Sequence, residues 1–161
     1  MAWFSQSHGI VPLTAQGEDA TSSLDLDSIN MAKYDHVTVC ILFAASLVGD
    51  NVLTFGCGAS DGTKTANATF HYRLGSAAPK ATSSDVYAAD ATSASLTLTA
   101  ATYQGKLLVC ELDAAEMNIS DTQYQYLTVN LDGTASTGTV TAWAVMSRPT
   151  YAEAVMDSVV A

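Results

Sequence analysis

The order of apolar and polar residues along this chain predicts β-strands wherever a period is visible. Segment 95–99 alternates strictly between polar and apolar side chains, the pattern of a strand with one buried face. Segment 138–147 divides in the same way into two interleaved sets, Thr139, Thr141, Trp143 and Val145 against Val140, Ala142, Ala144 and Met146. Others are short runs rich in β-branched and apolar residues. The predicted strands are residues 37–43, 52–57, 67–73, 95–99, 106–112, 124–130 and 138–147. Clusters of Gly, Asp and Asn separate them, as in antiparallel sheets with tight turns.

This pattern predicts an all-β fold, a single-domain antiparallel β-sandwich of the jelly-roll or immunoglobulin-like type. About seven to eight strands are expected, the number typical of a two-sheet sandwich. Helical signal is confined to one turn at 113–117, which begins with Asp113, and to a short segment at 151–159. We expect an extended N-terminal arm at 1–30, the β-sandwich domain at 31–148 and a C-terminal tail at 149–161. Residues 75–94 lack strand character and predict a long loop.

Charge narrows the classes of partner. The 161 residues include 6 Lys and Arg against 16 Asp and Glu, which gives a net charge of -10. Nucleic-acid binding needs clustered basic residues that displace counterions from phosphates, and an anionic membrane surface makes the same demand. We therefore expect no direct nucleic acid partner and no membrane partner. The longest apolar stretch, 39–45, is far shorter than the roughly 20 residues of a transmembrane helix.

Small neutral side chains dominate the composition. Ala, Thr and Ser make up 61 of the 161 residues, whereas charged residues are only 14%. Small side chains lose little entropy on burial, so such a surface suits lateral packing against other subunits. The first residues show no basic region followed by an apolar one, and Cys40, Cys57 and Cys110 fit no disulfide or metal spacing. We interpret Cys40 and Cys110, which lie within apolar runs, as buried hydrophobes and expect folding in a reducing cytoplasm.

Candidate catalytic chemistry is sparse. No nucleophile elbow and no phosphate-binding loop are present. The best enzymatic constellation is Glu111 with Asp113 and His36. Asp25 and Asp27 form a second carboxylate pair that could hold Ca²⁺, although a solvated loop is the favoured interpretation. We expect no enzymatic activity, no metal and no cofactor.

Aromatic residues outside the predicted strands are better candidates for function. Aromatic side chains and Arg are common anchors of protein interfaces. The candidate protein-interface residues are Trp3, Phe4, His8, Ile10, Val11, Leu13, Arg148 and Tyr151. An alternative function from another class is a carbohydrate-binding β-sandwich that uses Tyr124, Tyr126 or Trp143.

Three segments together resemble a family of small structural proteins of tailed-bacteriophage heads. Residues 31–39 (MAKYDHVTV) are similar to that family's Y-x-H-V entrance to its first strand, and 108–117 (LVCELDAAEM) to its V-x-E-(V/L)-D-A segment. The end of the last predicted strand, with Arg148 and Tyr151, looks like the closing R-x-Y region, although Pro149 and Thr150 separate this pair further than the motif does.

The resemblance implies a virion protein, most plausibly a capsid decoration (cement) protein. Such a protein binds the major capsid protein on the outer surface of the capsid and stabilises the shell. A homo-oligomer is then expected, with a trimer as the favoured form, made in the host cytoplasm and located on the virion. Deletion of residues 1–13 is expected to abolish attachment and leave the sandwich folded. The alternative within the virion is a head-tail adaptor or tail structural protein.

Overall fold

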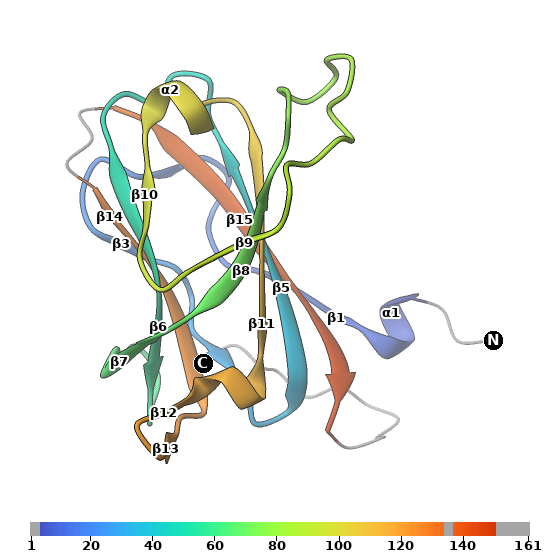
Figure 1. The fold of residues 1–161 in the computed structure, drawn as a ribbon, viewed down its shortest axis with the longest axis vertical. Coiled ribbons are helices and arrows are strands. Elements are labelled where there is room, and N and C mark those ends of the chain that lie inside the picture. The colour runs from blue at the N-terminus through green and yellow to red at the C-terminus, as the bar shows by residue number, and fades with distance from the viewer. Residues whose placement is uncertain (1–3, 134–136, 151–161) are drawn as a thin grey trace.

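The computed structural model describes residues 4–133 and 137–150 and shows two packed β-sheets with very little helix (Figure 1). The prediction of an all-β antiparallel sandwich is confirmed, since every strand pairing in both sheets is antiparallel. Among the described residues, no helix is long and apolar enough to cross a membrane.

The larger sheet has seven strands, in the order β1-β15-β5-β11-β8-β9, with β2 also paired to β15. These strands are β1 (Gly9–Pro12), β2 (Glu18–Asp19), β5 (Tyr34–Phe43), β8 (Phe70–Leu74), β9 (Ala91–Ser93), β11 (Leu107–Asp113) and β15 (Thr139–Pro149). Its centre, β15-β5-β11, joins segments from opposite ends of the chain.

The smaller sheet has six strands, in the order β10-β6-β14-β3, with β4 paired to β14 and β7 to β6. These strands are β3 (Leu24–Asp25), β4 (Ile29–Asn30), β6 (Asn51–Gly58), β7 (Ala66–Ala68), β10 (Leu96–Leu98) and β14 (Tyr126–Gly133). A separate hairpin joins β12 (Asn118–Ile119) to β13 (Thr122–Gln123).

The predicted alternation decides which side chains form the core. Along β15, Val140, Ala142, Ala144 and Met146 are buried, and the residues between them face outward. β5 behaves in the same way, with Val37, Val39, Ile41 and Phe43 directed inward. The two layers therefore meet through one face of each sheet, as a period of two residues requires.

The sequence prediction of a single strand at 67–73 is wrong. The chain leaves the smaller sheet at Ala68, passes through exposed Thr69 and enters the larger sheet at Phe70. Ala68 and Phe70 are both buried, so the alternation continues through the crossing and hides it. Across the core, the Phe70 ring stacks on Phe55 of β6 with centroids 4.3 Å apart.

The N-terminal segment is extended, but most of it belongs to the sandwich. β1 and β2 add to the larger sheet, whereas β3 and β4 pair with β14 of the smaller one. The short helix α1 (Phe4–Ser7) precedes them and stands out from the body of the molecule (Figure 1). The boundary between arm and sandwich thus lies near residue 8 instead of residue 30.

Helical elements are short, as expected. The predicted turn at 113–117 is a 3-10 helix, η1 (Ala114–Met117), in which the Glu116 carboxylate accepts a hydrogen bond from the backbone N–H of Asp113 at 2.8 Å. Together with the reverse contact, between the Asp113 side chain and the Glu116 backbone N–H, this arrangement is a capping box. Helix α2 (Ala100–Tyr103) was not predicted. The helix predicted at 151–159 lies outside the described residues.

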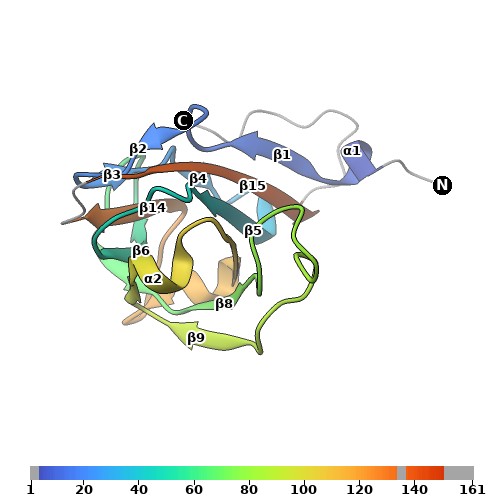
Figure 2. The same ribbon diagram turned by 90° about the horizontal axis from the view of Figure 1, so that it is seen from above.

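The predicted loop at 75–94 is partly wrong, because β9 forms within it and pairs with β8. Residues 75–90 leave the sheet as a protrusion, on the same side as α1 in both views (Figures 1 and 2). At its base, Gly75 forms a bridge with Tyr87, and the Ala88 N–H donates to the Leu74 carbonyl at 2.9 Å. Val86 and Tyr87 are exposed on it.

Candidate functional site

The predicted interface residues at the start of the chain divide into two groups. Phe4 and Ile10 are 55% and 58% exposed. The Phe4 ring stacks on His8, with centroids 4.2 Å apart and an angle of 8° between the planes. The His8 N–H donates to the Phe4 carbonyl at 2.9 Å, which closes the single turn of α1. These three side chains are therefore held in place without being part of the core.

Val11 and Leu13 are corrected, because both are buried in the chain's own core. Val11 lies opposite Ala144 on β15, and the Leu13 N–H donates to the Ala142 carbonyl at 2.9 Å. The alternation that turns Ile10 outward turns its neighbour inward. Two further predicted residues, Trp3 and Tyr151, lie outside the described residues.

Ile10 belongs to an apolar patch at the edge of the larger sheet. In the register of β1 and β15, Ile10 lies opposite Val145 and Pro12 lies opposite Trp143. All four side chains face away from the core, since the residues between them on β15 are buried. We call Ile10, Pro12, Trp143 and Val145 the N-terminal edge patch. β1 has no partner on its other side among the described residues, so the patch lies beside an open edge.

Arg148 has an unusual backbone. Its φ is +53°, a region that L-residues other than Gly seldom adopt, and Pro follows it. The side chain is exposed and forms an ion pair with Asp113 of β11. The ion-pair partner of Glu111 in the described structure is His36.

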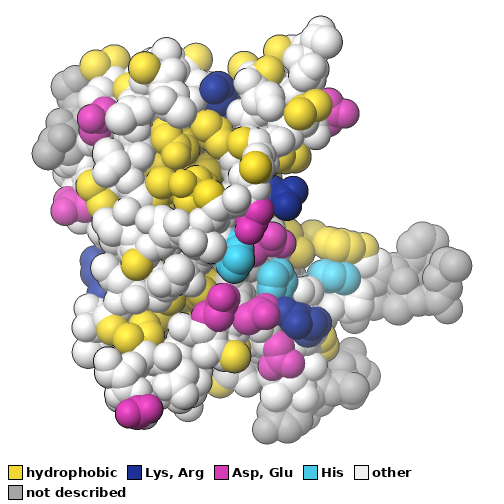
Figure 3. All heavy atoms as spheres, viewed as in Figure 1, with side chains coloured by type: hydrophobic (Ala, Val, Ile, Leu, Met, Phe, Trp, Pro, Cys, Tyr) yellow, Lys and Arg dark blue, Asp and Glu magenta, His cyan; other side chains and the backbone are white. Residues whose placement is uncertain are grey.

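On the outer face of the larger sheet, the face turned away from the core, histidine and acidic side chains alternate from strand to strand. From β8 to β15, the strands contribute first His71, then Glu111 and Asp113, then His36 and last Arg148. Figure 3 shows the histidine side chains gathered on one face with acidic side chains between them and near the N-terminal segment. We call this row, with Arg73, Asp90 and Glu116 around His71, the histidine-acid network.

The network contains the three residues that sequence analysis named as the best enzymatic site. His36 Nδ1 lies 2.6 Å from Asp113 Oδ1, and its Nε2 lies 3.6 Å from Glu111 Oε1. They come together on an open sheet surface: Glu111 is exposed, and the carboxylates face solvent.

The Asp25 and Asp27 pair lies elsewhere, beside a shallow pocket of about 320 Å³. Asp25 accepts hydrogen bonds from Lys64 Nζ at 2.5 Å and Asn130 Nδ2 at 2.6 Å, so its charge is already compensated. Burial raises the pKa of Asp27, and the nearby Asp61 carboxylate adds to the increase. Among the described residues, no group of three or more His, Cys, Asp or Glu side chains is arranged to hold a metal ion.

The cysteines are free thiols; Cys110 is buried as predicted, and Cys57 is buried as well. Burial raises the pKa of Cys57 to about 11 and that of Cys110 well above the ordinary value. The prediction that Cys40 is buried is wrong, because Cys40 faces outward on β5 and is only partly buried. Burial and the negative charge of Glu111 both raise its pKa.

The three aromatic residues of the carbohydrate hypothesis do not form one platform. Tyr126 starts β14 of the smaller sheet, whereas Trp143 lies on β15 of the larger one. Tyr124 precedes β14 and packs against the core. Tyr124 therefore has the ordinary role of such residues, which is packing within the sandwich.

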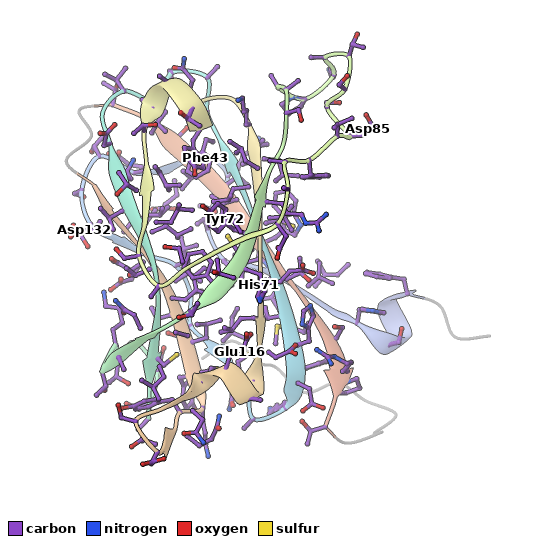
Figure 4. All side chains as sticks on the ribbon, viewed as in Figure 1. Phe43, His71, Tyr72, Asp85, Glu116 and Asp132 are labelled. Carbon is purple, nitrogen blue, oxygen red and sulfur yellow. The ribbon has the colours of Figure 1, made fainter. Side chains whose placement is uncertain are left out.

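Sequence reasoning missed the part of the network around His71. His71 Nδ1 lies 2.9 Å from Asp90 Oδ2, and its Nε2 lies 4.0 Å from Oε1 of Glu116, the residue of η1 labelled below it in Figure 4. The Asp90 hydrogen bond is the largest cause of the raised pKa of His71, which nearby carboxylates raise further. The only local signal was a His and an Arg at alternate positions, 71 and 73, on the same face of a predicted strand.

Comparisons with protein-family models, with curated proteins and with solved structures found no match to this chain.

Proposed function

We propose that this protein is a structural component of a phage virion, a decoration protein that binds the outside of the major capsid shell and stabilises it. The observation that carries the proposal is the N-terminal edge patch, an apolar surface at an open sheet edge with exposed Phe4 just before it. Large apolar side chains on a surface rimmed by polar residues are typical of protein interfaces. The short-motif resemblance to phage head proteins supports the same assignment.

The way the segment is anchored fits attachment without unfolding. Val11 and Leu13 fix β1 in the core, so Phe4 and Ile10 are presented by a held element. A partner then pays little ordering entropy for this contact, because the segment is already in place. Many equivalent copies around a symmetric shell add avidity to a modest single contact.

The net charge of the protein favours binding to a different protein over long-range attraction between its own copies. The net charge of -10 makes copies of this protein repel one another at long range and favours a neutral or basic shell surface. A homo-oligomer, with a trimer as the favoured form, then depends on close apolar contacts such as those of the edge patch.

The test is binding of purified variants to shells assembled from the major capsid protein of the same phage. Phe4→Ser and Ile10→Ser are expected to weaken binding by tenfold or more and to leave the melting temperature unchanged. Val48→Ser is the matched control, since Val48 is 53% exposed in the segment between β5 and β6. Undiminished binding of both N-terminal variants would contradict the proposal.

Deletion of residues 1–13 is a poor test, contrary to the sequence expectation, because it removes two core side chains and an entire strand. Copy number distinguishes the second placement. A decoration protein is present in hundreds of copies per particle, whereas a head-tail adaptor occurs in the few copies of a single ring. Mass spectrometry of intact particles measures this number directly.

A further inference from the structure

The histidine-acid network joins four strands and a 3-10 helix through side chains alone. His36 comes from β5, Glu111 and Asp113 from β11, His71 and Arg73 from β8, Arg148 from β15 and Glu116 from η1. Asp90 immediately precedes β9, at the end of the 75–90 protrusion. The network therefore lies where the protrusion returns to the sheet.

Acidic groups outnumber the arginines in the network. The four carboxylates, Asp90, Glu111, Asp113 and Glu116, face two arginines, Arg73 and Arg148. The acids therefore exceed the arginines by two negative charges among groups a few ångströms apart. A protonated His71 reduces that excess and places a positive charge beside Asp90, Glu111 and Glu116.

The position of Glu111 connects His71 to the rest of the network. In the sheet register, Glu111 lies directly opposite His71 on β8 and Thr38 on β5, and His36 Nε2 lies 3.6 Å from its Oε1. Side chains directly opposite in a sheet interact, and opposite charges there are stabilising. When His71 is neutral, Glu111 loses the cation opposite it on β8.

We propose that the histidine-acid network is a pH-sensitive clasp, closed when His71 is protonated, which fastens the base of the 75–90 protrusion to the larger sheet. The clasp tightens as the pH falls and loosens as it rises. It is a property of the single chain and does not depend on which partner the protein has.

The groups facing each histidine are consistent with this direction. Around His71 they are Asp90, Glu116 and Glu111 as acids and Arg73 as the base, which itself lies 3.8 Å from Asp90. Around His36 they are Asp113, Glu111 and, through Asp113, Arg148. The raised pKa of His71, caused first by its hydrogen bond to Asp90, shows that acids dominate its surroundings.

The sign follows from linkage. A histidine whose pKa is higher in the folded than in the unfolded chain adds stability below its unfolded pKa, about 6.5. That stability is lost as the pH rises through the folded value. The melting temperature should therefore decrease from pH 6 to pH 8.5 because of His71.

The experiment compares the wild type with His71→Gln between pH 6 and pH 8.5. Gln retains a hydrogen-bond donor without a titratable charge, so the variant should lose a large part of the pH-dependent decrease in melting temperature. His8→Gln is the matched control, because His8 contacts Phe4 and Ser7 and has no carboxylate partner among the described residues. It should retain the full decrease.

Two further measurements report on the clasp in the folded protein, without thermal unfolding. The NMR titration of the His71 ring should have its midpoint above 6.5, and Asp90→Asn should lower that midpoint. Amide exchange should lose several-fold protection at the Ala88 N–H between pH 6 and pH 8, after correction for intrinsic rates, and less in His71→Gln. Equal pH dependence in the wild type and His71→Gln, or a His71 midpoint at or below 6.5, would overturn the proposal.

Discussion

The two faces of the seven-stranded sheet differ although the same strands build both. On β5, Val39 and Ile41 are fully buried, and between them Cys40 is partly exposed beside Glu111 of β11. The inner face is uniformly apolar and makes the sandwich. The outer face carries the N-terminal edge patch and the histidine-acid network. Stability therefore resides on one side of each strand and the candidate functional chemistry on the other.

The largest expected effect breaks the inner face. Ile41→Ala removes a fully buried side chain and should lower the free energy of unfolding by about 2–5 kcal/mol. Leu42→Ala, the outward neighbour on the same strand, should cost about 1 kcal/mol or less. Urea denaturation measures both, and similar losses would show that the two faces are not energetically distinct.

A second pair of substitutions compares an inward and an outward side chain of the N-terminal segment. Leu13→Ala should cost about 2–4 kcal/mol, because Leu13 is part of the core. Ile10→Ala should change stability by no more than about 0.5 kcal/mol, since Ile10 is largely exposed. If Leu13→Ala is as mild as Ile10→Ala, residues 9–13 are not part of the folded sandwich.

Sequence patterning predicted the inner face far better than the outer one. Burial alternates along β5 and β15 as the apolar residues do, because a strand with one wet face records that in a local period. The four- and two-residue strands of the N-terminal segment are too short to show a period, so the sequence pattern predicts an extended arm there.

The local sequence pattern could not predict the histidine-acid network. His71 and Glu111 are 40 positions apart and meet only because β8 pairs with β11, and no rule of spacing specifies that pairing. His36, Glu111 and Asp113 were named together, but their setting on an open face depends on strand order. Which exposed polar side chains meet depends on the pairing of strands that are distant in the sequence. The alternation that marks the core carries no information about that pairing.

A smaller effect sharpens the comparison through thiol chemistry. Cys40 on the outer face should react with a maleimide under native conditions, whereas Cys57 and Cys110 should react only when the protein unfolds. Because the charge of Glu111 raises the pKa of Cys40, Glu111→Gln should increase its reaction rate a few-fold near pH 8. An unchanged rate would show that Glu111 does not influence the Cys40 thiol.

The smallest expected effect lies outside both faces. Asp25→Asn removes the charge that pairs with Lys64 at a partly exposed site and should cost less than about 1 kcal/mol. The Asn side chain can still accept a hydrogen bond from Asn130. Thermal unfolding at low and high salt checks this, since most of the loss should disappear when salt screens the pair in the wild type.

The crossing at Thr69 gives the sandwich a mechanical property. One residue separates a strand hydrogen-bonded in the smaller sheet from a strand hydrogen-bonded in the larger one, so a covalent tether links the two layers. A force that shears one layer over the other must first tear ladder hydrogen bonds on one side of this tether. Pulling the layers apart is thus resisted by the chain itself, and not only by contacts such as the Phe55–Phe70 stack.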